Sequence, residues 1–516
     1  MEAQEKGKEG GGGEMLRSTE KDPHGDTSML QSFGYDQELS RSLGPLTSFG
    51  LAFSYTSPTV GAYTLFAFGL ATGGGLFIWG LPIVVAGQVL VALIFAELAV
   101  IYPMAGALYQ WARRLIGPRY GWLVGWAYCW ALLITIAAVD LGAAPFVLET
   151  LGLRPFGSAG GEGVEESSVG EVGIALLVCA LQTTINIGGV RITTLLTNVG
   201  MILEFIMTLG IALFLLVSSG PHQPYSSVFE PSPSYTGNLP FLSAILSQAF
   251  IFYGFESAAA VSEEVRDSRK SVPRTMVLSL ISAAFAVLLL QSRPDLSTTS
   301  ISAIFQICYV SCAGAEQAAI ARMIWAYARD DVLPFSSWLK KVSPRTQVPV
   351  NATLVAAAIP MCVMLTTLIR VGKLNVHEIV VDYCIAGGRL DKHTLLTEQT
   401  THHSDYFGLG KLRLPVGIGA LVYGVAMIVN LLWPRPVDEL RGWVTLLVTV
   451  AVLAVGVVVV RGRNKQVTSL SASFHFDERT YLLEEAKRSP EALNMRATLH
   501  RPLSFSSGAP RQEKVS

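Results

Sequence analysis

Long apolar runs are the feature that most constrains what this chain can fold into. Each run is close to the ~20 residues that an α-helix needs to cross the hydrocarbon core of a bilayer. Charged residues make up only 15% of the 516 residues, whereas soluble domains average about 25%. The sequence therefore predicts an all-α, polytopic membrane protein. The runs are residues 46–69, 76–101, 122–148, 171–190, 195–218, 241–261, 272–291, 299–325 and 350–369 (spans 1–9), followed by 414–433 and 442–460 (spans 11 and 12).

Polar tails flank the predicted transmembrane domain, which we place at residues 45–460. Residues 1–44 are rich in Gly, Glu, Lys and Ser without periodicity, as is typical of a disordered segment. They lack the apolar stretch that a signal peptide requires. Residues 461–516 form a second polar tail. We expect about 11–12 membrane helices between the two tails.

Basic residues predict the orientation of the spans, because cytoplasmic loops carry an excess of Lys and Arg. Clusters of them follow spans 2, 6 and 8, whereas the loops after spans 3 and 5 carry almost none. Both observations place the N-terminal tail in the cytoplasm. The alternative, that these are ordinary solvated charges, predicts no such alternation. The clusters contain Arg113, Arg114, Arg119, Arg266, Arg269, Lys270, Arg274, Arg322, Arg329, Lys340, Lys341 and Arg345.

Spans 1 and 6 both contain residues that interrupt helices. Residues 54–61 read Ser-Tyr-Thr-Ser-Pro-Thr-Val-Gly, and residues 252–256 read Phe-Tyr-Gly-Phe-Glu. Proline cannot donate to the helix ladder, and glycine tolerates unwinding. Broken helices of transporters use such backbone to hold substrate and ions. For span 1 alone, a proline kink whose hydroxyls bond back to their own helix is the alternative. The matching positions, each at the start of a five-span block, favour a binding site.

Three motifs resemble those of one family. Residues 96–111 (Ala-Glu-Leu-Ala-Val-Ile-Tyr-Pro-Met-Ala-Gly-Ala-Leu-Tyr-Gln-Trp) are similar to a signature of the amino acid–polyamine–organocation superfamily. Residues 252–256 with the charged loop 263–274 resemble the same superfamily, and so do residues 322–334. Within it, the chain resembles the fungal GABA/choline permease-like branch over roughly residues 40–460.

This resemblance implies secondary active transport of an amino acid, GABA, choline or a polyamine by alternating access. It implies a five-plus-five inverted-repeat (LeuT-like) bundle with the substrate between helices 1, 3, 6 and 8. A substrate carboxylate would meet backbone amides between Thr56 and Gly61, and aromatic rings of helix 6 would cover its ammonium group. Helix packing is the alternative for each ring. The candidate substrate-binding residues are Tyr55, Thr56, Ser57, Thr59, Gly61, Phe252, Tyr253, Gly254 and Phe255.

Ionisable residues within spans are costly in hydrocarbon and mark functional positions. Glu97 lies near the cytoplasmic end of span 2, which favours a gate or a salt bridge over substrate contact. Glu204, in the middle of span 5, is a candidate for coupling to a proton or another cation, with an internal hydrogen bond as the alternative. Glu256 is a further coupling or gating candidate, whereas Asp140 and Glu316 are weaker candidates. We expect no cofactor, and a proton as the coupling ion with sodium as the alternative.

The chain departs from the family in two places. Only residues 292–297 separate span 7 from span 8, where the family has a longer connection. In the tenth span only residues 378–388 are apolar, and they include Asp382. A helix of that length reaches about 16 Å, against ~30 Å of hydrocarbon, so the tenth helix is predicted to be defective. Without a tenth crossing, spans 11 and 12 would be inverted and the C-terminal tail would lie outside the cell.

Other classes of protein fit the sequence poorly. It has no phosphate-binding Gly loop, no Ser/His/Asp arrangement and no Cys/His spacing typical of a metal site, so we expect neither an enzyme nor a metalloprotein. A net charge of −1 gives no reason to expect a nucleic acid partner. The expected partners are a small amine or amino acid and the lipid bilayer, in the plasma membrane or in a vacuolar or other endomembrane. The rival interpretation is a non-transporting nutrient sensor or an inactive remnant.

Overall fold

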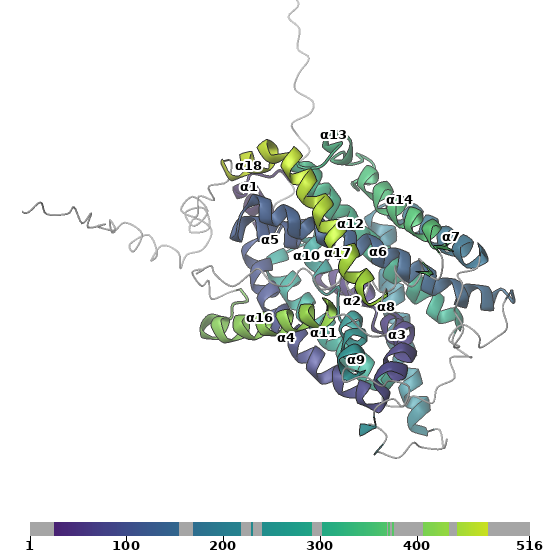
Figure 1. The fold of residues 1–516 in the computed structure, drawn as a ribbon. Coiled ribbons are helices and arrows are strands. Elements are labelled where there is room, and N and C mark those ends of the chain that lie inside the picture. Colours follow the sequence, from purple (N-terminus) through teal and green to yellow (C-terminus); the bar gives the residue numbers. More distant parts are fainter. Residues whose placement is uncertain are drawn as a thin grey trace, which may run out of the picture. The chain divides into compact units, whose positions relative to one another are not determined.

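The structure is a computed structural model, in which the described elements are helices apart from two strands of two residues each (Figure 1). It describes residues 25–153, 169–217, 226, 229–230, 240–291, 302–368, 370–371, 374–375, 406–432 and 441–472.

The helix α1 (Asp26–Ser32) belongs to one unit, and residues 37–472 form a second unit, a helical bundle. The bundle contains α2 (Pro45–Thr56), α3 (Pro58–Gly73), η1 (Gly74–Leu76), α4 (Phe77–Ile101), α5 (Ala107–Leu115), α6 (Pro118–Thr150), α7 (Val169–Ile187), α8 (Val190–Val217), α9 (Pro240–Ile251), α10 (Ser257–Ala260), η3 (Ser262–Glu264), α11 (Ser268–Gln291), α12 (Ser302–Arg329), α13 (Ser336–Leu339), α14 (Val350–Thr366), β1 (Arg370–Val371), β2 (Leu374–Asn375), η5 (Gly410–Leu412), α16 (Arg413–Leu432), α17 (Arg441–Gly462) and α18 (Asn464–Ala472).

Six of the described helical stretches are long and apolar enough to cross a membrane. Two shorter apolar helices, Val350–Thr366 and Leu447–Gly462, accompany them. The prediction of an all-α, multi-pass membrane protein is therefore confirmed. The six stretches are Gly69–Ile101, Pro118–Thr150, Val169–Ile187, Val190–Gly210, Ser268–Gln291 and Gly410–Asn430.

The predicted interruption of span 1 is present in the structure. The helix α2 ends at Thr56 and α3 begins at Pro58. Ser57 between them adopts the left-handed conformation, with φ 30° and ψ 76°, which is uncommon for a residue that carries a Cβ. Proline suits the first position of α3, because its missing N–H would have no partner there and its ring fixes a helical φ. The break therefore follows from local chemistry.

Span 6 is interrupted as well. The helix α9 ends at Ile251, and α10 begins only at Ser257. Gly254 lies in the gap with φ 98°, a backbone conformation that glycine adopts without steric cost and other residues rarely adopt. Glycine at this position therefore permits the chain to turn between the two half-helices.

The two breaks meet at α12. The short helix α10, directly after the helix 6 break, contacts both α2 and α12, and α12 also contacts α3 beyond the helix 1 break. On its other sides α12 packs against α6, α7, α8 and α14. Side chains of α12 can therefore reach both interruptions.

The segment directly before α2 pairs with the loop that follows helix 6. Leu43 N–H donates to the Glu264 carbonyl and Arg266 N–H donates to the Leu43 carbonyl, both at 2.9 Å, which makes a parallel bridge between Leu43 and Val265. Within the predicted N-terminal tail, residues 26–32 are helical. The boundaries of the membrane domain at residues 45 and 460 remain predictions.

Span 11 begins at the end of the bundle that carries the basic clusters. Arg413 Nε, in the first turn of α16, lies 3.4 Å from Glu97 Oε2 near the end of α4. The Arg269 guanidinium carbon lies 3.8 Å from the ring centroid of Tyr406. The predicted inversion of spans 11 and 12 is therefore not what the structure shows, because these contacts fix the entry of span 11 at the basic end. The predicted defect at residues 378–388 lies outside the described residues.

Span 12 ends at the same basic end. Arg119 Nε, at the start of α6, donates to Asn464 Oδ1 at 2.9 Å, and Trp126 Nε1 donates to the Val452 carbonyl at 3.0 Å. These bonds hold α17 and α18 alongside α6. Since Arg119 belongs to the predicted cytoplasmic cluster after span 2, we expect the end of α18 to lie on the cytoplasmic side.

We accordingly expect an epitope tag at Ser516 to be inaccessible to antibody in intact cells and accessible after permeabilisation. An N-terminal tag should behave in the same way, since Leu43, before α2, pairs with the loop that carries the basic residue Arg266. A tag inserted in the loop between α6 and α7 serves as the control and should be labelled in intact cells. Labelling of the Ser516 tag without permeabilisation would contradict the placement of α17.

Candidate functional site

A buried carboxylate from α8 caps the break of helix 1. The Thr59 N–H donates to Glu204 Oε1 at 2.8 Å, and the Ser57 hydroxyl donates to the same oxygen at 3.1 Å. Glu204 is 1% exposed. The free N–H groups and the dipole at a helix N-terminus both favour a negative group. Glu204 therefore takes donors that the break would otherwise offer to a bound anion.

The other hydroxyls of span 1 divide between two roles. The Thr56 hydroxyl donates to the Ala52 carbonyl one turn earlier, at 3.0 Å. This is the alternative raised for span 1, in which hydroxyls bond back to their own helix. The Ser54 hydroxyl donates instead to a backbone carbonyl of α8 at 2.8 Å. The Thr59 hydroxyl oxygen lies 3.4 Å from that of Thr208, also on α8. The hydroxyls on either side of the break thus tie helix 1 to α8.

The break of helix 6 lies against helix 1. A Cβ added to Gly254 would stand 2.1 Å from Tyr55 Cδ1, so the backbone of one break touches the side chain beside the other. The carboxylate of Glu256 holds this turn with both oxygens: Oε2 accepts from the Gly254 N–H at 3.1 Å, and Oε1 accepts from the Tyr128 hydroxyl at 2.9 Å. Glu256 therefore stabilises the interruption and joins it to α6.

Glu316 of α12 lies where the two breaks meet. Its Oε1 accepts a hydrogen bond from the Tyr253 hydroxyl, and the Tyr253 ring meets the Tyr55 ring edge to face at 5.8 Å. One turn earlier, the Cys312 thiol donates to the Tyr55 carbonyl at 3.4 Å. Glu316 is 0% exposed, and its Oε2 and the Tyr55 hydroxyl are both buried without a hydrogen-bond partner. We call Glu316, Tyr253 and Tyr55 the Glu316 cluster.

The remaining predicted residues make packing contacts in this structure. Phe252 and Phe255 are fully buried in the apolar core, and the Phe255 ring lies 6.1 Å, centroid to centroid, from Phe95 of α4. A Cβ at Gly61 would stand 3.1 Å from Ile251 Cα, so the glycine allows α3 to approach α9 closely. Packing is thus the observed role of these rings.

Three buried ion pairs join the loops at the basic end. They connect η3 and α5 with the C-terminal end of α12 and the residue that follows it. Their charged side chains are at most 8% exposed. The pairs are Arg322 with Glu264 (2.7 Å), Arg329 with Glu263 (2.9 Å) and Arg113 with Asp330.

A buried network of amide side chains joins α6, α7 and α12. Gln182 Nε2 donates to Asp140 Oδ1 at 2.7 Å. Asn186 Nδ2 donates to Gln317 Oε1 at 2.8 Å, and Gln317 Nε2 donates to the Thr183 hydroxyl at 2.9 Å. Asp140 was a candidate from the sequence, whereas the neutral side chains of Gln182, Thr183, Asn186 and Gln317 were not predicted. Their spacing along one face of α7 is the signal that would have found them.

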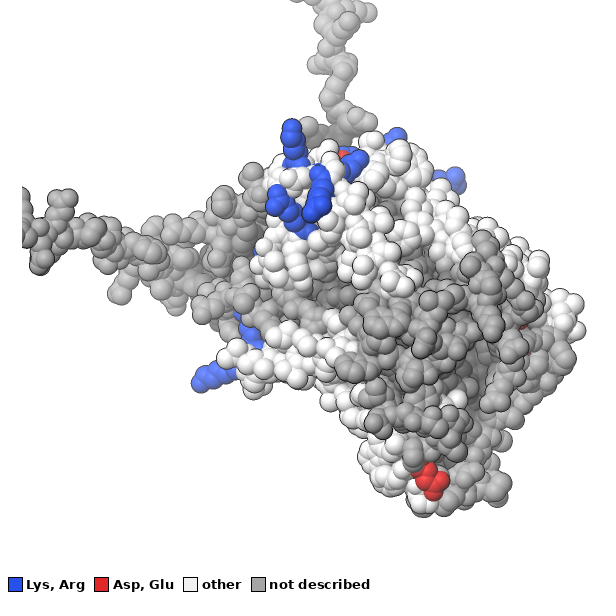
Figure 2. Space-filling model, in the orientation of Figure 1, with Lys and Arg blue, Asp and Glu red and all other residues white. Residues whose placement is uncertain are grey.

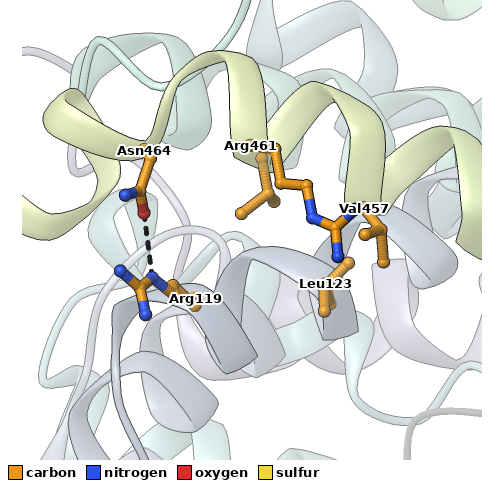
Figure 3. Close-up of a pocket in the computed structure, with 6 residues that line it drawn as sticks. Arg119, Leu123, Val457, Arg461 and Asn464 are labelled. Carbon is orange, nitrogen blue, oxygen red and sulfur yellow. Dashed lines mark hydrogen bonds between the residues drawn. The ribbon is translucent and has the colours of Figure 1, made fainter.

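A surface pocket of about 380 Å³ lies at the basic end, between α6 and α17 (Figure 3). Its lining combines Arg119 and Arg461 with apolar side chains and Asn464. Figure 2 shows Lys and Arg side chains gathered over the end of the bundle where α18 lies. This pocket offers no carboxylate and no aromatic ring to an amine. Among the described residues, no group of three His, Cys, Asp or Glu side chains could hold a metal ion.

Comparison with known proteins decides the family. The amino acid permease family matches residues 43–314 and 298–460. The chain belongs to this family. The resemblance to amino acid–polyamine–organocation permeases is thereby confirmed, and a similarity to a yeast GABA-specific permease supports the fungal-like branch.

Named permeases from a plant, a yeast and a bacterium are similar to the chain, the first two over most of its length. The amino-acid permease BAT1 of Arabidopsis thaliana is 25% identical over 466 residues, which cover 79% of this chain and 88% of that protein. The GABA-specific permease of Saccharomyces cerevisiae is 24% identical over 434 residues, 76% and 75% of the two chains. The branched-chain amino acid permease BcaP of Lactococcus lactis is 30% identical over 226 residues, 41% and 46% of the two chains. Membership of this family makes the chain a membrane permease for amino acids rather than an enzyme.

Proposed function

We propose that this permease is a secondary active transporter of amino acids or related amines, of the class that includes GABA, choline and polyamines. The substrate would bind between the breaks of helices 1 and 6, within a five-plus-five inverted-repeat bundle that opens to the two sides in turn. The observation that carries the proposal is the meeting of both breaks at Glu316. Paired broken helices are where transporters of this kind place substrate and coupling ions.

The chemistry of the meeting point suits an ammonium group. A carboxylate and two tyrosine rings attract a cation by charge and by the negative faces of the rings. The names of two relatives refer to GABA and to branched-chain amino acids, and both kinds of molecule carry an ammonium group. In this proposal Tyr55, Tyr253 and Gly254 lie beside the substrate, whereas Phe252 and Phe255 support the break.

Glu204 is the proposed coupling group. As a carboxylate it accepts from both Ser57 and Thr59 at the helix 1 break. A proton on Glu204 would remove the charge and weaken both hydrogen bonds, because bonds to a charged acceptor are the stronger ones. Proton binding would thus loosen α3 from α8 at the break, which links the proton to a change in the shape of the site.

The proposal is tested by uptake of radiolabelled GABA, choline, putrescine and leucine into proteoliposomes that contain the purified full-length protein. We expect at least one of them to accumulate against its gradient when an inward proton gradient is imposed, and a protonophore to abolish that accumulation. A sodium gradient without a proton gradient should have no effect. Binding without accumulation of any substrate would instead favour the nutrient-sensor interpretation.

We predict that Glu204→Gln retains exchange of substrate between the two sides but loses proton-driven accumulation. Glutamine keeps the size of the side chain and its carbonyl acceptor, yet it cannot take up a proton. The pH dependence of uptake should therefore become flat. Uptake and counterflow exchange of the same labelled substrate, measured at several pH values, check this. A variant with the wild-type pH profile would remove Glu204 from coupling.

A further inference from the structure

Of the three carboxylates at the breaks, Glu316 is the one with an oxygen that is fully buried without a hydrogen-bond partner. Glu256 bonds with both oxygens, and Glu204 Oε1 alone receives two hydrogen bonds. Glu316 Oε2 is buried without a partner. A buried carboxylate oxygen that has lost water and gained no donor is unfavourable, and in native proteins it marks a place for a missing partner. A donor that carries positive charge would satisfy it best.

The immediate surroundings of Glu316 offer a second unused group of the same kind. The Tyr55 hydroxyl is buried without a hydrogen bond of normal geometry. The Tyr128 hydroxyl lies beside it, and the charges of Glu316 and Glu256 both act on it. An ammonium group has three donors and no acceptor, so it can bond to a carboxylate oxygen and to a tyrosine oxygen at once. The Tyr55 and Tyr253 rings, held at a fixed angle to each other, add two aromatic surfaces.

No basic side chain of the participating helices supplies that charge. Residues 42–112, 192–265 and 294–321 contain neither Lys nor Arg. These ranges include both breaks, all of α8 beyond its first turns and the part of α12 that carries Glu316. Glu204, Glu256 and Glu316 thus lie in segments of these helices that contain no basic residue. A positively charged bound species would balance the charge of the Glu316 carboxylate.

The same structure leaves little at the helix 1 break for a substrate carboxylate. The Thr59 N–H and the Ser57 hydroxyl already donate to Glu204, and Pro58 has no N–H to offer. A carboxylate placed there would also face the Glu204 carboxylate at close range, and like charges repel. A substrate carboxylate between Thr56 and Gly61 would therefore compete with the Glu204 carboxylate for the same donors.

We propose that the Glu316 cluster binds the ammonium group of the substrate, and that a carboxylate on the substrate contributes little to binding. The permease would then accept organic amines that have no carboxylate as well as amino acids. This inference rests on the proposed function, because it names the chemical group that is recognised at the same site.

A set of three four-carbon ligands separates the two groups. Butylamine carries only the ammonium group, butyrate carries only the carboxylate, and GABA carries both. With purified full-length protein we expect both butylamine and GABA to raise the melting temperature of the protein. Each should also displace radiolabelled GABA from it. Butyrate should do neither. Stabilisation by butyrate comparable to that by GABA, or none by butylamine, would overturn the proposal.

Two variants locate the effect. Glu316→Gln should weaken both ammonium ligands about tenfold or more, since it removes a charged hydrogen bond. Asp140→Asn is the matched control, because Asp140 is also a 0% exposed carboxylate within a membrane helix with one bonded oxygen and one without a partner. Its hydrogen bond comes from the Gln182 amide and not from a tyrosine at the breaks. This variant should leave the order of the three ligands unchanged. Unaltered affinity in Glu316→Gln, or an equal loss in Asp140→Asn, would remove Glu316 as the ammonium ligand.

The melting assay keeps this inference separate from transport. If butylamine and GABA bind through Glu316 but no labelled substrate accumulates in vesicles, the proposed transport function fails and the ammonium site stands. If labelled substrate accumulates and Glu316→Gln leaves the affinity for it unchanged, transport stands and the ammonium site fails.

Discussion

Replacing Gly254 with leucine should abolish uptake while leaving membrane insertion intact. The Cβ atom of the new side chain is already unfavourable for two reasons. The backbone at Gly254 has φ 98°, which a residue with a Cβ rarely adopts, and the Cβ would stand 2.1 Å from Tyr55 Cδ1. Tyr55 is fully buried and packs against Tyr253, so helices 1 and 6 must separate. Uptake of a labelled substrate, normalised to the amount of protein in the membrane, measures the loss.

The matched control for this substitution is Gly173→Leu. Gly173 lies within α7, and a Cβ added there meets no atom within 4 Å, so transport should stay at the wild-type level. Gly254→Ala tests the contact with the least added volume and should also lose most of the uptake. Wild-type uptake by Gly254→Leu would show that the approach of the two breaks is not needed for transport, and the proposed site would have to be abandoned.

Sequence alone predicted the elements whose cause is local. Apolar runs long enough for a bilayer identified the membrane helices, since the requirement depends only on length and composition. Pro58 and Gly254 marked the two interruptions, because one removes a backbone donor and the other tolerates a positive φ. The structure contains both interruptions at these residues.

Contacts between distant segments could not be predicted in the same way. Glu316 was weighed as a weak candidate because its position in span 8 does not say which helix it faces, and its partner Tyr253 lies 63 residues away. Glu204 and Thr59 are separated by 145 residues. The number of membrane crossings predicted that spans 11 and 12 are inverted. The contact of Arg413 with Glu97 instead places the start of span 11 at the basic end, and a count of crossings cannot predict such a contact.

The second large effect is expected where a buried ion pair is broken. Arg322 Nε lies 2.7 Å from Glu264 Oε1, and a second contact joins Nη2 to Oε2 at 3.3 Å. The two side chains are 4% and 1% exposed. Removal of one partner of such a pair leaves an uncompensated buried charge and costs about 3–5 kcal/mol. Glu264→Gln should therefore lower the melting temperature of the detergent-solubilised protein sharply.

An exposed ion pair on the same loop region provides the comparison. Lys340 and Asp331 lie 2.9 Å apart, but their side chains are 41% and 61% exposed, and such surface pairs are worth roughly 0–1 kcal/mol. Asp331→Asn should thus melt close to the wild type. Exchanging the charges in Glu264→Arg/Arg322→Glu should recover part of the loss, because opposite charges face each other again. If Glu264→Gln melts like Asp331→Asn, the Arg322–Glu264 pair does not hold η3 to α12, and the basic end of the bundle must be fixed by other contacts.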